Sequence, residues 1–570
     1  TVAWNAGTRK AIETLRAGLS EDVKKNVSDA ELERVIFDVA SPVANRLKGE
    51  DIEHVGEILK KARECIRAFG ENPHSTEALQ CYAFIKEILA GVTHRGKERT
   101  TFTSLADKLL LNRVFGVVFF FAAMWGVFWC IYTLAAFPMD WIDGWFGSLG
   151  ESVGAKLEAS PVFQSLVVDG IIAGVGGVLV FLPQILILFF FLGLLESTGY
   201  MARAAFLMDK LFGWCGLNGK SFVPMLSGYA CGIPGIMGAR TIEDPKARLA
   251  TILAVPFMSC GARMPVYVLM CGVLQRVLSE NPAYAESSAG IASAVFVAMY
   301  FVGVIVAVPV SWLYTKFVLK SKAAPFVLEM PRYQLPRLRD IGLRVWQSGW
   351  EYTRRAGTII FAMSVIIWFL SYFPRSEAVA EQARTEFVAE TAAAQNVPVA
   401  EFEKTLVAAE EAEEPSEAQE ALVGALGNKI DGAWMENSYI GRFGKFCQPV
   451  FAPCGFDWRI TVGVLGSFPA RELIVSTLGI TYSLGGDVDE ETEDLYATME
   501  KTTHADGSPV FTIPVIIGIM VFFALCGQCL AEIVVIARES TWKWACIAWA
   551  QMTFLAWLGA VLCFQIGSLF

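Results

Sequence analysis

One apolar stretch, residues 216–267, is repeatedly broken by prolines and glycines, and it sets the strongest constraint on how this chain can fold. It is apolar enough to lie in a lipid bilayer, and Cys231 and Cys260 stand at its breaks. Non-helical backbone survives at membrane depth only where protein buries it or where it lines a cavity. Interrupted apolar segments are also the best sequence indication of a transporter's substrate site. The stretch therefore predicts a permeation or binding site with sulfur ligands.

The composition of the chain is that of a polytopic membrane protein. Of its 570 residues 54% are hydrophobic and 18% are charged, whereas soluble domains have about 25% charged residues. Several segments exceed the roughly 20 apolar residues that a spanning helix needs. We therefore expect an all-α fold that crosses the membrane several times. The net charge of −10 and the absence of a basic stripe argue against a nucleic-acid partner.

Apolar and charged segments divide the chain into successive regions. They predict a small soluble helical domain at 20–100, a first transmembrane region at 101–200, a first gate region at 201–320, a cytoplasmic connector with one transmembrane helix at 321–374, an acidic external insert at 375–458, and a second gate region with the C-terminal transmembrane helices at 459–570.

The distribution of charge predicts the orientation of the chain in the membrane. Lysine and arginine are concentrated in 95–113 and 316–355, whereas 375–458 is acidic. Because cytoplasmic loops carry an excess of basic residues, we expect a cytoplasmic N-terminus and an external acidic insert.

Two short apolar segments have like-charged flanks and should enter and leave the membrane on one side. The flanks of 221–238 are basic and those of 460–483 are acidic, so the two segments should dip from opposite faces. Each is followed by a full span, 249–273 and 511–536. This pattern predicts two inverted gate repeats, built from re-entrant or broken helices, around a central site.

The first gate region supplies candidate ligands for a metal ion: Cys231, Met258, Ser259 and Cys260. Soft sulfur ligands favour transition metals over Mg²⁺ or Ca²⁺. All four histidines lie outside the predicted spans, so an intramembrane metal site would have to use sulfur, hydroxyl, carboxylate or carbonyl ligands. The alternative is that these cysteines are small packing residues.

Cys526 and Cys529 are the corresponding candidates in the second gate region. Their spacing within an apolar helical run would place both sulfur atoms on one face of a helix, and a packing role is equally compatible with it. Cys447 and Cys454 share a polar segment, where a disulfide is one alternative and two free thiols the other.

Carboxylates within apolar segments are costly to bury, so they indicate function by default. Glu472 is the strongest candidate, and the neighbouring Arg471 could pair with it structurally. Glu532 has Arg538 as its expected partner.

The chain resembles the ferrous iron transport protein B family, the bacterial Fe²⁺ transporters. Five long motifs carry the resemblance, which extends over nearly the whole chain: 169–209, 216–267, 325–336 (PFVLEMPRYQLP), 461–482 (TVGVLGSFPARELIVSTLGITY) and 537–544 (ARESTWKW).

The resemblance implies two inverted gate domains around an iron path, with gate cysteines such as Cys231, Cys260, Cys526 and Cys529 as ligands. It also implies a cytoplasmic GTP-binding domain joined through a helical spacer. Residues 1–19 resemble the end of that domain, with Asn5 and Ala6 in place of the family's usual Ser-Ala base-contacting loop. The phosphate loop and magnesium ligands lie outside this sequence, so GTP and Mg²⁺ would act only through that domain. We therefore expect a transporter, not an enzyme.

The resemblance further implies residence in the bacterial inner membrane, Fe²⁺ as substrate, small accessory proteins A and C as partners, and a homo-oligomer as one assembly. The rival hypothesis is a gate-type carrier of nucleosides or other organic solutes, which would have an aromatic, polar cavity and tolerate loss of the cysteines. A membrane scaffold or sensor, which would show no flux, is the second rival.

Overall fold

The computed structural model describes most of the chain as helices joined by turns. The described residues are 4–21, 24, 27–38, 52–69, 73–92, 102–157, 160–214, 216–217, 219–280, 282, 284–319, 331–395, 397–410, 416–468, 471, 473–484, 492–504 and 507–569. Within them no strand forms, and pairing of the β type is limited to one isolated bridge, Thr503–Pro509. The expected all-α fold is confirmed. The chain divides into two compact units, 1–101 and 102–570.

The first unit is a small helical domain with its own apolar core. Its core includes Leu15, Leu32, Ile36 and Ile66. The side chain of Asn5 caps the first helix by accepting a hydrogen bond of 2.8 Å from the Thr8 amide, as Asn commonly does at this position. The sequence also predicts a helical period through Ile36, Val39, Val43 and Leu47, and the last three of these residues lie outside the described residues. The helices are α1 (Ala6–Gly18), α3 (Asp29–Phe37), α5 (Ile52–Ala68) and α6 (Pro73–Val92).

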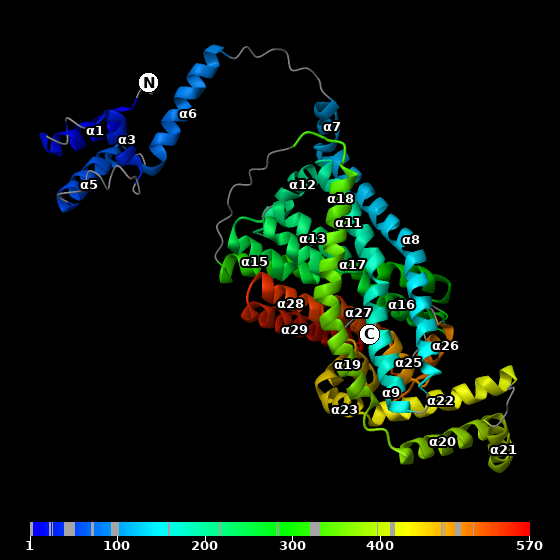
Figure 1. The fold of residues 1–570 in the computed structure, drawn as a ribbon. Helices are drawn as coiled ribbons and strands as arrows, with labels where there is room; N and C mark the ends of the chain where they lie inside the picture. The colour runs from blue at the N-terminus through cyan, green and yellow to red at the C-terminus, as the bar shows by residue number, and fades with distance from the viewer. Residues whose placement is uncertain are drawn as a thin grey trace. The chain divides into compact units, whose positions relative to one another are not determined.

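The second unit is a polytopic membrane bundle (Figure 1). Six helical stretches in the described part of the chain are long and apolar enough to cross a membrane: Val114–Gly154, Pro161–Ser197, Pro245–Glu280, Ala285–Val318, Ile513–Glu539 and Trp542–Gly567. A seventh candidate is Thr358–Tyr372 joined to Glu377–Ala393, with a bend of 69° between them.

The first membrane helix is longer than the sequence predicts. The apolar run at 114–137 predicts one span, and Trp141 and Trp145 predict an interfacial segment after it. Helix α8 (Arg113–Gly154) instead continues through Pro138 for 42 residues. Proline is tolerated inside membrane helices because neighbouring groups satisfy the freed carbonyl. The elements around it are α7 (Phe102–Leu110), α9 (Pro161–Ser165), the π-helix η1 (Leu166–Ile172), α10 (Ala173–Val180) and α11 (Leu182–Ser197).

The first gate region is built from short, interrupted helices. Helices α13 and α14 have 9 and 7 residues, far fewer than the roughly 20 that a span requires, and they pack against each other as the arms of a re-entrant segment do. The elements are α12 (Tyr200–Trp214), η2 (Gly219–Ser221), α13 (Phe222–Ala230), α14 (Gly232–Gly238), η3 (Ala239–Thr241), α15 (Pro245–Ala254), η4 (Val255–Phe257), η5 (Gly261–Arg263) and α16 (Met264–Glu280).

The second gate region repeats this organisation. Helices α24 and α25 have 9 residues each and also pack against each other. They are followed by a broken membrane helix, as in the first region. The elements are α24 (Trp458–Gly466), α25 (Leu473–Thr481), α26 (Glu493–Lys501), α27 (Ile513–Leu525), α28 (Leu530–Glu539) and α29 (Trp542–Gly567).

The two gate regions form one core, and the elements between them are mostly long helices. Helix α14 packs on α28, and α16 packs on both α25 and α27. The connecting elements are η6 (Ala285–Ser287), α17 (Ser288–Leu313), η7 (Tyr314–Val318), α18 (Leu338–Tyr352), η8 (Thr353–Gly357) and α19 (Thr358–Tyr372).

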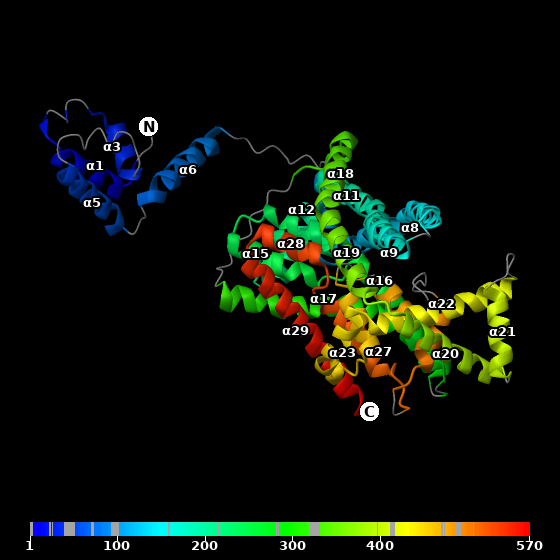
Figure 2. The same ribbon diagram turned by 60° about the horizontal axis from the view of Figure 1, so that its bottom comes forward.

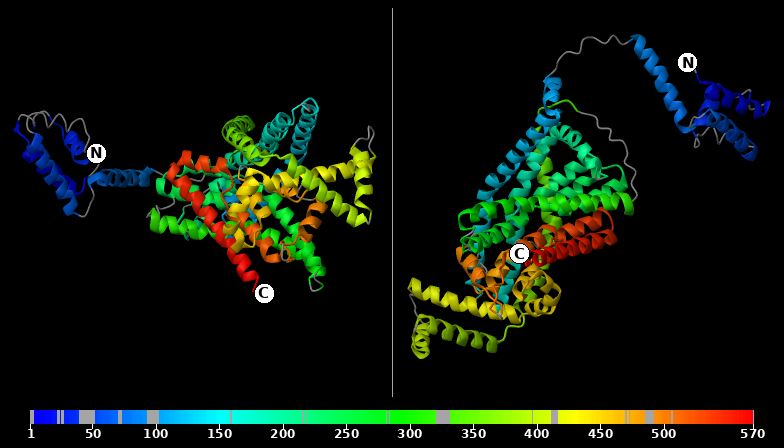
Figure 3. Two further views of the ribbon diagram at one scale, coloured as in Figure 1. Left: turned by 90° about the horizontal axis from the view of Figure 1, so that it is seen from below. Right: turned by 180° about the vertical axis from the view of Figure 1, so that it is seen from behind.

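The acidic insert starts with three helices that share a small apolar core of their own. Residues 377–410 project from the bundle (Figure 2), at the end opposite to α7 and α12 (Figures 1 and 3), whereas the later helices of the insert pack on α24 and α25 of the second gate region. Cys447 and Cys454 are free thiols in helical segments, so the disulfide alternative is wrong. The elements are α20 (Glu377–Gln395), α21 (Val399–Glu410), α22 (Glu417–Asn437), α23 (Tyr439–Phe451) and η9 (Ala452–Cys454).

Candidate functional site: a cavity where four helix breaks meet

Each gate region contains two helix breaks, and three of these four breaks carry cysteines. Cys231 separates α13 from α14 in an extended conformation, with φ −156° and ψ 135°. Cys260 lies between η4 and η5, also extended. In the second region, residue 471 lies between α24 and α25, and residues 526–529 separate α27 from α28.

The break at 526–529 corrects one prediction. We expected Cys526 and Cys529 within one continuous helix, whereas both have extended backbone. Two hydrogen bonds join this break to the α24–α25 segment. The Cys526 carbonyl accepts from Arg471 Nη2 at 3.2 Å, and the side-chain Nε2 of Gln528 donates to the Val464 carbonyl at 2.9 Å.

The four breaks surround one cavity of about 100 Å³, which we call the central cavity. Its polar lining comes from all four breaks, from α11 and α18, and from the start of α28. The polar or sulfur-bearing side chains on its wall are Gln184, Cys231, Cys260, Tyr352, Arg471, Cys529 and Glu532.

The predicted ligands divide into three groups by position. Cys231, Cys260 and Cys529 line the central cavity. Met258, Ser259 and Cys526 are buried beside it. The Met258 side chain faces Gly228, and the Ser259 hydroxyl lies 3.4 Å from the Met299 carbonyl. Glu472 lies outside the described residues. A ligand role for any of these residues stays a prediction.

A buried ion pair lies on the wall of the central cavity and corrects a second prediction. Glu532 pairs with Arg471 rather than with the expected Arg538, the Nη2–Oε2 distance being 3.4 Å. Their side chains are 2% and 7% exposed. Arg471 Nη1 also lies 3.5 Å from Cys260 Sγ. The pair thus joins a break of the first gate region to two breaks of the second.

A second buried arginine holds the first gate region's break in shape. Arg263 donates to the carbonyls of Pro256, Phe257 and Met258 at 3.0, 3.2 and 2.7 Å. These carbonyls have lost their helical partners at η4, and unsatisfied backbone groups are costly in an apolar environment. Arg263 therefore stabilises the unwound backbone before Cys260.

Sequence reasoning missed Gln184, Arg263 and Arg471 as contributors to the site, and it gave Glu532 the wrong partner. A signal was present, because Arg263, Arg471 and Glu532 are ionisable residues within apolar gate segments, and such residues face the interior of a bundle and indicate a pathway.

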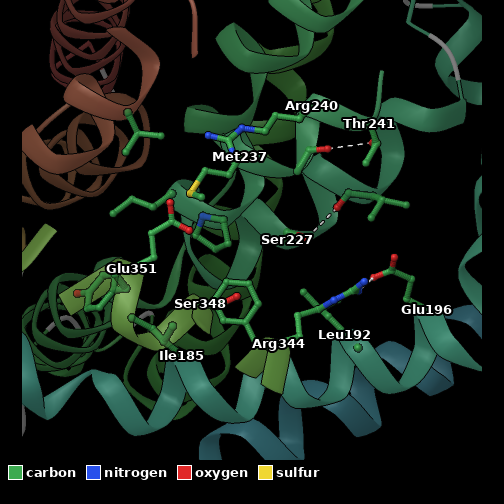
Figure 4. A pocket seen from close by; sticks show the side chains of 18 of the residues that line it. Ile185, Leu192, Glu196, Ser227, Met237, Arg240, Thr241, Arg344, Ser348 and Glu351 are labelled. Carbon is green, nitrogen blue, oxygen red and sulfur yellow. Dashed lines mark hydrogen bonds and ion pairs between the residues drawn. The ribbon is translucent and has the colours of Figure 1, made fainter. Parts of the chain in front are cut away.

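Two larger cavities adjoin the central cavity. The first, of about 310 Å³, is lined by Arg240, Arg344 and Arg538 and is called here the arginine-lined cavity. Figure 4 shows Arg240 and Glu351 on one side of it and the ion pair of Arg344 with Glu196 on the other. It shares wall residues with the central cavity: Ile185, Ile233, Tyr352 and Ala531.

The second neighbour, of about 470 Å³, lies on the other side of the shared wall and is called the aspartate-lined cavity, after Asp169 and Asp431. Asp169 accepts a hydrogen bond of 2.6 Å from Ser165. This cavity shares Phe181, Tyr352 and Ile360 with the central cavity. Among the described residues, the two larger cavities share only Tyr352 with each other, whereas each shares several wall residues with the central cavity, so the three form a series with the central cavity between the other two.

The central cavity combines sulfur and carboxylate side chains, yet they do not converge on a point. Among the residues that the structure describes, no three His, Cys, Asp or Glu side chains are close enough together to hold a metal ion. A cation in the cavity would therefore meet these groups one or two at a time, unless the breaks move together.

Gly232 is required for the approach of Glu532 to the break at Cys231. A Cβ at Gly232 would lie 1.9 Å from Glu532 Oε1. We expect Gly232→Ala to displace the carboxylate from Arg471 and to lower the free energy of unfolding by about 1–3 kcal/mol, the usual cost of overpacking. Thermal unfolding in detergent checks this. Gly238→Ala in the same helix, where the nearest atom is 3.9 Å away, is the control; equal melting temperatures for both variants would contradict the prediction.

A bundle of membrane helices whose two broken gate regions enclose a polar cavity defines a membrane transporter. The gate family model, described as nucleoside recognition, matches residues 178–274 and 353–543, and the model of the ferrous iron transport protein B C terminus matches residues 296–347. The chain belongs to the FeoB family.

Relatives of the chain bear this out. It is 39% identical over 497 residues to the "Fe(2+) transport protein A/Fe(2+) transporter FeoB fusion protein" of Porphyromonas gingivalis, covering 86% of this chain and 55% of that protein. It is 34% identical over 536 residues to the "Fe(2+) transporter FeoB" of Leptospira interrogans (90% and 69%) and 32% identical to that of Staphylococcus aureus (93% and 68%). The chain thus spans little more than half of the first relative and about two thirds of the others. No solved structure matches the chain significantly.

Proposed function

We propose that this chain carries Fe²⁺ across the bacterial inner membrane through the central cavity. The observation that supports this most is the meeting of four helix breaks at one cavity whose wall includes Cys231, Cys260 and Cys529. Thiol sulfur suits first-row transition metals better than Mg²⁺ or Ca²⁺. Ligands that engage an ion one or two at a time favour passage, because a conducting site must also release its ion.

The series of cavities supports a direction of transport. The acidic helices α20–α22 stand at the end of the bundle opposite to α7 and α12. Because cytoplasmic ends are rich in lysine and arginine, we place α7 and the N-terminus in the cytoplasm and the insert outside. In this orientation Fe²⁺ enters through the aspartate-lined cavity and leaves through the arginine-lined cavity.

The size of the central cavity disfavours the rival carrier of organic solutes. Sites for drug-sized ligands occupy about 300–1,000 Å³, whereas the central cavity has about 100 Å³. That volume accommodates an ion with few water molecules and would have to expand severalfold for a nucleoside.

The second part of the proposal is that a nucleotide controls transport. We place GTP binding and hydrolysis, with Mg²⁺, in a cytoplasmic domain preceding the residues of this chain, so that the chain itself contributes transport. The P. gingivalis relative is named as a fusion of transport protein A with FeoB, which supports a protein A as partner. An accessory protein C and a homo-oligomer remain expectations from the family resemblance.

Anaerobic uptake of radioactive Fe²⁺ into proteoliposomes tests the proposal, with the cytoplasmic GTP-binding domain supplied and omitted. We expect uptake to need that domain and to fall at least about tenfold in Cys260→Ser, because the hydroxyl oxygen is a harder and poorer ligand for this ion than sulfur. Cys546→Ser, at an exposed position on α29, is the matched control. Uptake unchanged in Cys260→Ser would remove this sulfur from the path, and no uptake by folded wild-type protein would refute the proposal.

A further inference from the structure

We propose that Arg471 is a tethered cation that competes with the transported ion for Cys260 and Glu532, and thereby sets the ion affinity of the central cavity. The inference rests on the proposed function in one respect: the competing ion is a divalent transition metal. It assigns to an arginine in the path the role of setting how tightly the ion binds.

The position of the guanidinium is the first argument. Arg471 lines the central cavity together with the three cysteines. Its Nη1 lies 3.5 Å from Cys260 Sγ and its Nη2 lies 3.4 Å from Glu532 Oε2. It therefore holds, with its own positive charge, the sulfur and the carboxylate that a transported cation would use.

The charge balance of the cavity is the second argument. Arg471 and Glu532 are the charged residues on its described wall, and together they are neutral. A divalent cation entering beside this pair would be repelled by the guanidinium as strongly as it is attracted by the carboxylate, and in a buried site neither effect is weakened by solvent as it would be in water. The ion can bind well only when the guanidinium moves away from Glu532.

The comparison of the two buried arginines is the third argument. Arg263 holds backbone carbonyls at 2.7–3.2 Å, whereas the contacts of Arg471 are 3.2–3.5 Å long and two of its three partners are side-chain atoms. Buried ion pairs contribute little net stability, because desolvation offsets their attraction. Arg263 is suited to hold the backbone, and Arg471 is suited to exchange partners.

Such an exchange accounts for both binding and release. An arriving ion takes the place of the guanidinium at Glu532 and at Cys260, whose thiol releases its proton to solvent as the sulfur binds the metal. The return of the guanidinium to Glu532, with reprotonation of Cys260, expels the ion. A fixed positive charge that competes in this way keeps binding weak enough for transport, as conduction requires.

The test measures binding separately from flux. Co²⁺ is titrated anaerobically into the purified chain, and sulfur coordination is followed by its thiolate-to-metal charge-transfer absorption. We expect Arg471→Gln to bind Co²⁺ at least about tenfold more tightly than wild type, since one full repulsive charge is removed beside the ion. Arg471→Lys, which keeps the charge, should stay within about threefold of wild type.

A second comparison keeps the test valid if Arg471→Gln, which leaves Glu532 unpaired, fails to fold. The double variant Arg471→Gln/Glu532→Gln has no unpaired charge, and we expect it to bind Co²⁺ at least about tenfold more tightly than Glu532→Gln alone.

In uptake, Arg471→Gln should lower KM and the maximal rate together, whereas a purely structural defect would lower the rate at unchanged KM. Equal Co²⁺ affinities within both pairs would overturn the inference, whereas absent uptake by the wild type would count against the proposed function instead.

Discussion

Glu532→Ala should lose Fe²⁺ uptake and a large part of its stability at the same time. The variant leaves Arg471 buried without its carboxylate partner, and breaking a buried ion pair from one side costs about 3–5 kcal/mol. It also removes the carboxylate on the wall of the central cavity. We therefore expect a lower melting temperature in detergent and uptake at the background of empty liposomes.

The control for this variant is Glu280→Ala, which removes a carboxylate at the exposed end of α16. Its melting temperature and uptake should match those of the wild type, because exposed charges contribute little to stability. If Glu532→Ala behaved like Glu280→Ala, the ion pair with Arg471 would have no energetic importance and the central cavity would not need its carboxylate.

Gly303→Ala should destabilise the protein although alanine is the better helix former. Gly303 lies on α17, and a Cβ there would stand 2.0 Å from the Phe257 carbonyl oxygen. A backbone atom cannot move aside as a flexible side chain can, so we expect Gly303→Ala to lower the free energy of unfolding by about 1–3 kcal/mol. The same carbonyl accepts from Arg263, so its displacement should also disturb the break before Cys260 and reduce uptake.

Gly290 provides a matched control on the same helix. A Cβ there would meet no atom within 4 Å, so Gly290→Ala should raise stability by about 0.5–1 kcal/mol. The two substitutions are chemically identical and should shift the melting temperature in opposite directions. Shifts of the same sign would show that the packing of α17 on η4 does not constrain the first gate region.

Much of this architecture could be predicted from local sequence. Proline and glycine mark the breaks in 216–267, and the flanking charges single out two segments too short to span. Each of these features determines the structure within a few residues of its own position in the sequence. Local sequence is accordingly enough to predict Cys231, Cys260 and Cys529 as candidate ligands.

The contacts across the site could not be predicted in the same way. The pairing of Arg471 with Glu532 arises because two breaks of one gate region approach each other, and local sequence favoured Arg538 instead. The unwinding at Cys526 is likewise accompanied by hydrogen bonds with α24 and with the break that follows it, although the apolar run alone predicts a continuous helix. Tertiary structure decided both outcomes.

The length of α8 links this protein to the thickness of its membrane. At about 1.5 Å per residue its 42 residues extend over about 60 Å, twice the roughly 30 Å of a hydrocarbon core. Aromatic side chains face outward along most of it, among them Trp125, Phe137 and Trp141. Such a helix must tilt or protrude, and helices that exceed the bilayer adjust their tilt as its thickness changes. Helix α8 packs on α10 and α11, which contribute to the walls of the cavities. A change in lipid chain length that tilts α8 would therefore shift these walls.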